Sequence, residues 1–147
     1  MPSSSERTAH PSALRPSRPP PPTAAPPTNE RRELGAAAER AVRAWLESRG
    51  LRILGCNVRV NYLEVDLLVQ DGRTLALVEV RTRATASWTS ALGSIDGWKR
   101  TRLRRAGERL WRRKYRHSAD FDHVRFDVAS VTWVQGEPVV EYIRAAF

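Results

Sequence analysis

The stretch NYLEVDLLVQDGRTLALVEVRTR, residues 61–83, contains two apolar runs on either side of Asp71-Gly72. An Asp-Gly pair between two alternating apolar runs is typical of a tight β-hairpin turn. The pattern predicts strands over 63–69 and 74–82. Three carboxylates interrupt these runs, and burying an unpaired carboxylate costs free energy. We therefore expect these acids either to face water or to be compensated by positive charge.

The positions of the acids follow from the alternation of side chains along a strand. Glu64, Asp66 and Leu68 share one face of the first strand, whereas Leu63, Val65, Leu67 and Val69 share the other. A two-residue turn at Asp71-Gly72 pairs Leu68 with Leu75, Asp66 with Leu77 and Glu64 with Glu79. Asp66 and Glu79 then become diagonal neighbours, about 7–8 Å apart at the backbone.

Carboxylates that converge in this way are suited to a hard divalent cation. Mg²⁺ and Mn²⁺ prefer oxygen ligands, retain several waters and need only a few protein carboxylates. The hairpin therefore predicts a site for Mg²⁺ or Mn²⁺ at Asp66 and Glu79. The alternative is a water-exposed sheet face on which the acids pair with Arg81 and Arg83, because charged side chains are ordinary at sheet edges.

The rest of the chain supplies the other layers of an α/β fold. Apolar residues recur at helical spacing over 34–49 and 94–115, and shorter apolar runs predict strands over 51–60, 124–134 and 139–143. The expected order is α-β-β-β-α-β-β, which favours a mixed β-sheet flanked by a helix on each face. Trp98 is expected on the buried side of the second helix. Trp88, in a Ser/Thr-rich loop, is interpreted as a packing residue, with base stacking as the alternative.

The N-terminal segment differs in composition from everything after it. Nine of the ten prolines lie between Pro2 and Pro27, and such a segment buries too little apolar surface to offset its ordering entropy. Residues 1–30 are therefore predicted to be a disordered proline-rich tail, and 31–147 a single domain. A partner that binds proline-rich segments is one expectation for the tail. No apolar run is long enough for a membrane span, and the single Cys56 fits a reducing cytoplasm.

The chain is strongly basic, with a formal net charge of +9 and a pI of about 11.1. Nucleic acid is the expected polyanionic partner. Residues 98–116 hold ten Lys or Arg against the single acid Glu108. The predicted nucleic-acid contacts are Lys99, Arg100, Arg104, Arg105, Arg109, Arg112 and Arg113. A solvated helix face, or an arginine bias from a GC-rich genome, is the alternative.

The hairpin acids and several other short motifs of this chain follow one another in the order seen in a known protein family. The chain resembles the YraN family of uncharacterised, endonuclease-like proteins within the restriction-endonuclease-like (PD-(D/E)XK) superfamily. The matching pieces are GAAAERAVRAWL (35–46), N-V-R (57–59), EVDLL (64–68), VEVRTR (78–83), Lys99, RFDVASV (125–131) and the closing AF.

The resemblance implies a restriction-endonuclease-like fold and nucleic-acid binding. We expect the partner to be DNA of branched or otherwise non-standard structure, and, if the protein is an enzyme, we expect it to hydrolyse phosphodiesters with Mg²⁺ or Mn²⁺. Asp66 and Glu79 match the metal-binding acids, and the Val80 carbonyl would be a further ligand. Glu64 matches the acid of the family signature. Glu39 matches an acid on the first helix that can complete such a site. Many related folds cut DNA as dimers, so a homodimer is also implied.

Two positions depart from the family pattern. Leu63 replaces a glycine, and Arg81 stands where the nuclease motif has lysine. Arginine stabilises negative charge but stays protonated and cannot act as a base. Lys99 could supply an ammonium group instead. Three readings stay open: a nuclease that uses these residues, a catalytically degenerate DNA-binding protein of the same fold, and a scaffold protein whose proline-rich tail recruits a partner.

Overall fold

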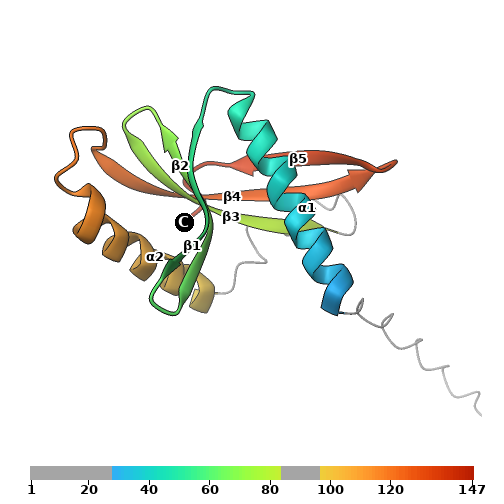
Figure 1. Ribbon diagram of the computed structural model, residues 1–147, viewed down its shortest axis with the longest axis horizontal. Helices are drawn as coiled ribbons and strands as arrows, with labels where there is room; N and C mark the ends of the chain where they lie inside the picture. Colours follow the sequence, from blue (N-terminus) through green and yellow to red (C-terminus); the bar gives the residue numbers. More distant parts are fainter. Residues whose placement is uncertain (1–27, 84–96) are drawn as a thin grey trace, which may run out of the picture.

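The predicted hairpin forms the middle of a five-stranded sheet. In the computed structural model, which describes residues 28–83 and 97–147, β2 (Leu63–Asp71) pairs with β3 (Thr74–Arg83). β1 (Arg52–Val60), β4 (His123–Val134) and β5 (Glu137–Ile143) complete the order β1-β2-β3-β4-β5 (Figure 1). Only the β3–β4 pair of this sheet is parallel, so the predicted mixed α/β sheet is confirmed.

The register of the hairpin differs from the predicted one by two residues. Leu68 pairs with Leu77 rather than Leu75, and the turn lies at Gly72-Arg73 between the paired residues Asp71 and Thr74. Contacts outside the hairpin explain the shift. Asp71 is held as a strand residue by Arg125, whose Nη2 lies 2.9 Å from its Oδ2. Arg73 is tied to the segment before β4, because its guanidinium donates to Asp122.

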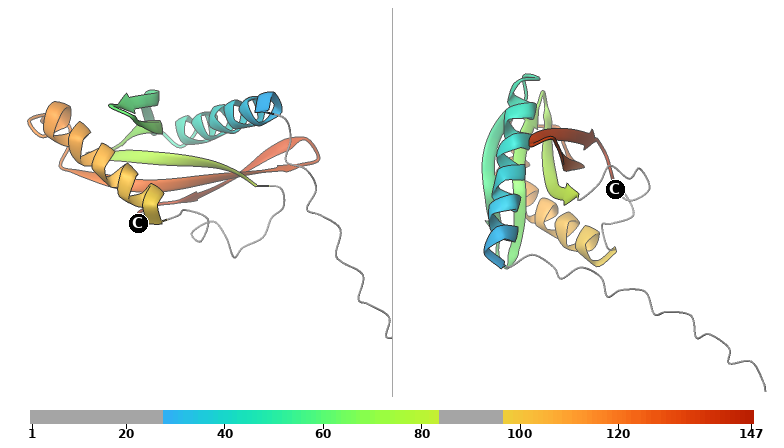
Figure 2. Two further views of the ribbon diagram at one scale, coloured as in Figure 1. Left: turned by 90° about the horizontal axis from the view of Figure 1, so that it is seen from below. Right: turned by 90° about the vertical axis from the view of Figure 1, so that its right-hand side faces the viewer.

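A helix covers each face of the sheet, as the two views in Figure 2 show. On one face lies α1 (Thr28–Glu47), and on the other lies α2 (Gly97–Leu110), which continues into the π-helix η2 (Trp111–Tyr115). The first helix starts six residues before the predicted position and includes the last three residues assigned to the tail. No helix in the described part of the chain is both long enough and apolar enough to span a membrane. Residues 1–27, Trp88 and the predicted start of the second helix at 94–96 lie outside the described residues.

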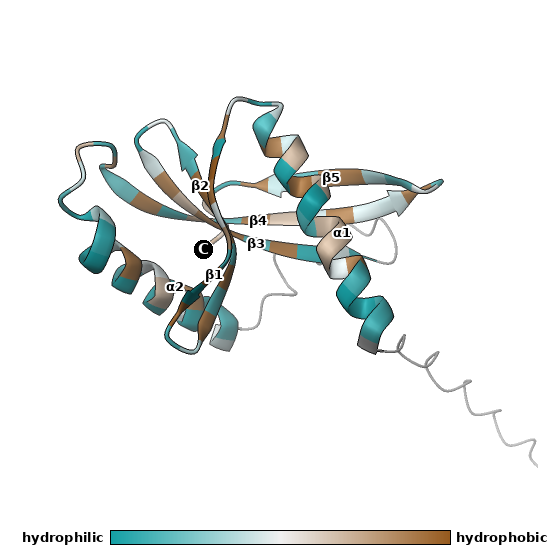
Figure 3. Ribbon diagram, viewed as in Figure 1, coloured by the Kyte–Doolittle hydropathy of each residue, from teal (hydrophilic) through white to brown (hydrophobic). Residues whose placement is uncertain are grey.

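Two hydrophobic clusters hold the layers together, and Figure 3 shows the strands as the most hydrophobic part of the molecule. The α1 side of the sheet buries Ala38, Val42, Leu46, Leu67, Val69, Ala76, Val78, Ala129 and Val131. The α2 side buries Leu63, Val65, Leu68, Leu75, Leu77, Leu103 and Ala106. Leu63 and Val65 at the start of β2 therefore pack on the α2 side, whereas Leu67 and Val69 pack on the α1 side, because the β1–β2 hairpin curls toward α2 (Figure 1). The expectation that Leu63, Val65, Leu67 and Val69 serve one face is wrong. Trp98 is 66% exposed rather than buried.

Gly107 sets how closely α2 approaches the sheet. A Cβ at this position would lie 2.7 Å from the ring of Phe126 and 3.3 Å from a methyl group of Leu77. We expect Gly107→Ala to lower the free energy of unfolding by about 1–3 kcal/mol, the usual cost of overpacking a core. The control is Gly35→Ala in α1, where a Cβ meets nothing within 4 Å. That change should stabilise the helix by about 0.5–1 kcal/mol. Equal urea midpoints for the two variants would contradict this account.

A buried polar cluster fastens the C-terminal segment to the sheet. Asp127 on β4 is fully buried, and its carboxylate accepts hydrogen bonds from the Arg125 guanidinium, the Tyr142 hydroxyl at 2.6 Å and the Ala145 amide at 2.9 Å. Phe147 stacks on Phe126, with ring centroids 5.5 Å apart. These contacts place Asp127 in a structural role.

Candidate functional site

Asp66 lies where the β2–β3 ladder ends. The last paired residues are Leu67 and Val78, and beyond them the Val80 amide donates a 2.8 Å hydrogen bond to Oδ2 of Asp66. Burial, together with the negative charges of Glu79 and Glu39, raises the pKa of Asp66 from its ordinary value of 3.8 to about 7. The Val80 hydrogen bond and the Lys99 charge oppose this rise. A carboxyl group held in a cluster of other acids is a common feature of functional sites.

Glu79 is the deepest carboxylate of the site, with 3% of its surface exposed. It lies on β3, which is flanked in the sheet by β2 and β4. Its Oε1 accepts a hydrogen bond from Nζ of Lys99 and lies 3.2 Å from Nε of Arg81. Its Oε2 is buried and has no hydrogen-bond partner among the described residues. This oxygen is therefore available to a further cation or a water molecule.

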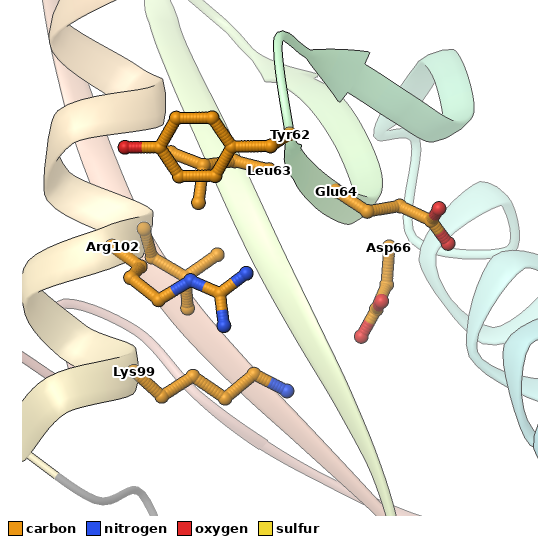
Figure 4. A pocket seen from close by; sticks show the side chains of 7 residues that line it. Tyr62, Leu63, Glu64, Asp66, Lys99 and Arg102 are labelled. Carbon is orange, nitrogen blue, oxygen red and sulfur yellow. The ribbon is translucent and has the colours of Figure 1, made fainter.

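Lys99 reaches the acids from the opposite element. It lies in the first turn of α2, and Figure 4 shows its ammonium directed toward Asp66 across a cavity. This cavity has a volume of about 300 Å³ and is lined by Tyr62, Leu63, Glu64, Asp66, Lys99, Arg102 and Leu103. Lys99 therefore brings an ammonium group to the acids from α2, on the side opposite Arg81 of β3. Of the two roles weighed for Lys99, the geometry favours the one inside the site.

Glu39 approaches from α1 on the edge of the same site. Its Oε2 accepts a 3.0 Å hydrogen bond from Nδ2 of Asn57 on β1. The negative charge of Glu39 also contributes to the raised pKa of Asp66. Asn57 has a positive φ of 49°, a backbone conformation that asparagine tolerates better than most residues. Sequence reasoning noted Asn57 only as part of a motif. Its role in holding Glu39 becomes visible only when β1 and α1 are brought together.

Glu64 does not join Asp66 and Glu79. Because the register is shifted, continuing it past Leu67 and Val78 brings Glu79 next to Asp66 rather than Glu64. The Glu64 carboxylate lies 3.5 Å from Nε of Arg59 on β1, and Figure 4 shows it turned away from Lys99 and Arg102. The predicted pairing of Glu64 with Glu79 is therefore wrong: Glu64 still lines the cavity beside Asp66, but its carboxylate pairs with Arg59.

The basic residues of α2 and η2 divide into two groups. Lys99 and Arg102 line the cavity, and sequence reasoning did not select Arg102. Among the remaining predicted contacts, Arg104, Arg105, Arg112 and Arg113 are exposed, whereas Arg100 and Arg109 are half-buried. Arg112 forms an exposed ion pair with Glu108 at 3.8 Å, and Arg100 lies over the ring of Phe147. The exposed members form a positive surface next to the site.

The donor set agrees with a small oxygen-preferring cation. Within residues 28–83 and 97–147, no three His, Cys, Asp or Glu side chains gather closely enough to form a complete metal cage. Two carboxylates suffice for Mg²⁺ or Mn²⁺, which keep waters and take further oxygens from substrate phosphates. Asp66 and Oε2 of Glu79 fit this requirement. The raised pKa of Asp66 means that additional positive charge would favour its ionised form. Oε2 of Glu79 has no hydrogen-bond partner among the described residues.

The fold and the site define an α/β protein of the restriction-endonuclease-like type. The model of the uncharacterised protein family UPF0102 matches residues 38–131. The chain is 51% identical over 118 residues to a UPF0102 protein of Sorangium cellulosum, covering 80% of this chain and 82% of the relative. It is 38% identical over 117 residues to the UPF0102 protein YraN of Salmonella newport, covering 80% of this chain and 86% of the relative. The chain belongs to the UPF0102 family, and the resemblance to YraN is confirmed.

Proposed function

We propose that this protein binds DNA and hydrolyses its phosphodiester bonds with Mg²⁺ or Mn²⁺ held by Asp66 and Glu79. One observation carries the proposal. Asp66 of β2 and Lys99 of α2 line one cavity, and Lys99 also donates a hydrogen bond to Glu79 of β3, so three elements bring two carboxylates and one ammonium together. A purely structural ion pair would not require a buried Glu79 oxygen that has no hydrogen-bond partner among residues 28–83 and 97–147, or the raised pKa of Asp66.

The residues divide the chemistry among them. The cation, when bound, supplies Lewis-acid chemistry and a lowered pKa for its water ligands. Lys99 contacts Oε1 of Glu79 in this structure, and an ammonium at this position stabilises the negative charge that develops on a phosphoryl oxygen. Arg81 adds fixed positive charge next to Glu79. Glu39, held by Asn57, offers an acceptor for a water that enters the site.

The exposed arginines of α2 and η2 supply affinity for DNA. Contacts between arginine and phosphate position a duplex without reading its sequence, and they weaken as salt concentration rises. The proposal includes the cytoplasmic location, the homodimer and the preference for branched DNA that were expected from the sequence.

Titration calorimetry with Mn²⁺, together with cleavage assays on linear, flapped and branched DNA, tests the proposal. The wild-type protein should bind Mn²⁺ and cut at least one of these substrates, and Asp66→Ala should lose both properties. Lys99→Ala should still bind Mn²⁺ but cut about 10²- to 10³-fold more slowly, because it removes one charge-stabilising donor. Glu64→Ala is the matched control and should retain Mn²⁺ binding. Wild-type protein that binds no Mn²⁺, or Asp66→Ala that cuts normally, would refute the proposal.

A second function is favoured by the charges around Glu79. Lys99 and Arg81 both contact this carboxylate, so its charge is already compensated without a metal. This arrangement supports a catalytically degenerate DNA-binding protein. In that case the wild-type protein binds DNA without cutting it, and Arg81→Lys, which restores the lysine of the motif, is the variant expected to show activity.

A further inference from the structure

The cavity beside the site has the chemical character of a nucleotide pocket. Leu63 and Leu103 give part of its lining an apolar character, and the carboxylates of Glu64 and Asp66 lie on its β2 side. Two cationic side chains, Lys99 and Arg102, enter it from α2. At about 300 Å³ it lies at the lower end of the range for small-ligand sites. A space of this size admits one nucleotide but not a double helix.

Tyr62 stands at the mouth of this cavity. Val60 pairs with Leu63, so Asn61 and Tyr62 form the two-residue turn of the β1–β2 hairpin, with Asn61 at a φ of 58°. Tyr62 is 70% exposed, and its ring extends toward α2 above the guanidinium of Arg102 (Figure 4). It also lines a second hollow of about 160 Å³ with Arg59, Asn61, Leu63 and Glu64. The side chain therefore borders open space on two sides.

An exposed aromatic ring beside a small cavity with two cationic side chains is suited to one kind of ligand. A flat aromatic ring beside a partly apolar lining binds an unstacked base, and such stacking is tolerant of sequence. Lys99 and Arg102 attract the phosphate attached to that base. In a duplex the bases are stacked on one another, so only their edges and the phosphates are presented. The pocket therefore matches an unpaired nucleotide in a single-stranded segment.

We propose that Tyr62 stacks on an unpaired base and thereby holds a single-stranded nucleotide in the cavity, with its phosphate toward Lys99 and Arg102. The inference rests on the proposed function, since it names the form of nucleic acid that reaches Asp66 and Glu79. It assigns the β1–β2 hairpin tip a role in recognising substrate. Tyr62 acts in binding and takes no part in the reaction itself.

The test compares three fluorescent DNA ligands in EDTA, so that binding is measured without cleavage. The ligands are a thymidine oligonucleotide, an oligonucleotide of the same length composed of abasic sites, and a blunt duplex. Tyr62→Ala should weaken binding of the thymidine oligonucleotide about 5- to 100-fold and leave the other two unchanged. Tyr62→Trp should retain wild-type binding. Arg102→Ala, which removes charge rather than an aromatic ring, should weaken binding of the thymidine and abasic oligonucleotides alike.

The outcomes separate this inference from the proposed function. An equal loss for the thymidine and abasic ligands with Tyr62→Ala, or no loss for either, overturns the role of Tyr62 even if the wild-type protein cuts DNA. A thymidine-specific loss in a protein that never cuts DNA supports the pocket and refutes the nuclease. Wild-type protein that binds none of the ligands overturns both. An unchanged thermal midpoint for Tyr62→Ala shows that the exposed hairpin tip still folds.

Discussion

Asp127→Ala is expected to lower the free energy of unfolding by about 3–5 kcal/mol, the cost of removing one partner from a buried charge pair. The change leaves the half-buried Arg125 without the carboxylate whose hydrogen bonds are the main cause of its raised pKa. It also leaves the Tyr142 hydroxyl and the Ala145 amide without their acceptor. Urea denaturation followed by circular dichroism measures the loss as a lower midpoint.

The control for this change is Asp122→Ala. Asp122 also accepts from an arginine, Arg73, with Nη2 and Oδ1 2.6 Å apart, but both side chains are mostly exposed. Water screens such a pair, so its removal should shift the midpoint far less. Equal shifts for the two variants would show that burial does not set the strength of the Asp127 cluster.

Asp66→Asn is expected to stabilise the metal-free protein at pH 8, by about 3 kcal/mol. The pKa of Asp66 is about 7 in the folded protein, against an ordinary value of 3.8. The folded state therefore holds this proton more tightly than the unfolded state does. As pH rises from about 4 to about 7, ionisation of Asp66 lowers the stability of the wild-type protein. Asparagine has no charge to lose and its side-chain oxygen can still accept from the Val80 amide.

Denaturant midpoints at pH 5 and pH 8, measured in EDTA, test this expectation. The advantage of Asp66→Asn over the wild-type protein should be large at pH 8 and smaller at pH 5. The same variant should lose Mn²⁺ binding, so it exchanges function for stability, as is common at active sites. An advantage that is equal at both pH values, or a variant less stable than the wild-type protein at pH 8, would contradict the assignment.

The elements and their order followed from the sequence because each carries strong local signals. Alternating apolar residues around Asp71-Gly72 identified β2 and β3, and helical spacing identified α1 and α2. The register could not be predicted in the same way. It depends on contacts of Asp71 with Arg125 and of Arg73 with Asp122, which join residues about fifty positions apart. The turn dipeptide alone contains no information on these partners.

The site was predictable to the extent that it lies on the hairpin. A shift of two residues leaves the faces of the strands unchanged, so Asp66 and Glu79 still meet, whereas Glu64 is carried to Arg59 instead. The groups that reach the site from other elements were harder to place. Lys99 was only one of several cations in a basic helix. Asn57 and Arg102 showed no distinguishing pattern, since their roles arise from packing between elements.

The parallel pairing of β3 with β4 has a consequence for synthesis. Thr74 pairs with His123 and Arg83 with Thr132, so β3 pairs with residues that are synthesised about fifty positions later. In addition, α2 packs against Phe126 of β4 at Gly107. The surface on which α2 packs is therefore incomplete until β4 has left the ribosomal exit tunnel. Cleavage by the proposed nuclease would then begin only when the protein is nearly finished, away from the ribosomal RNA beside which it is made.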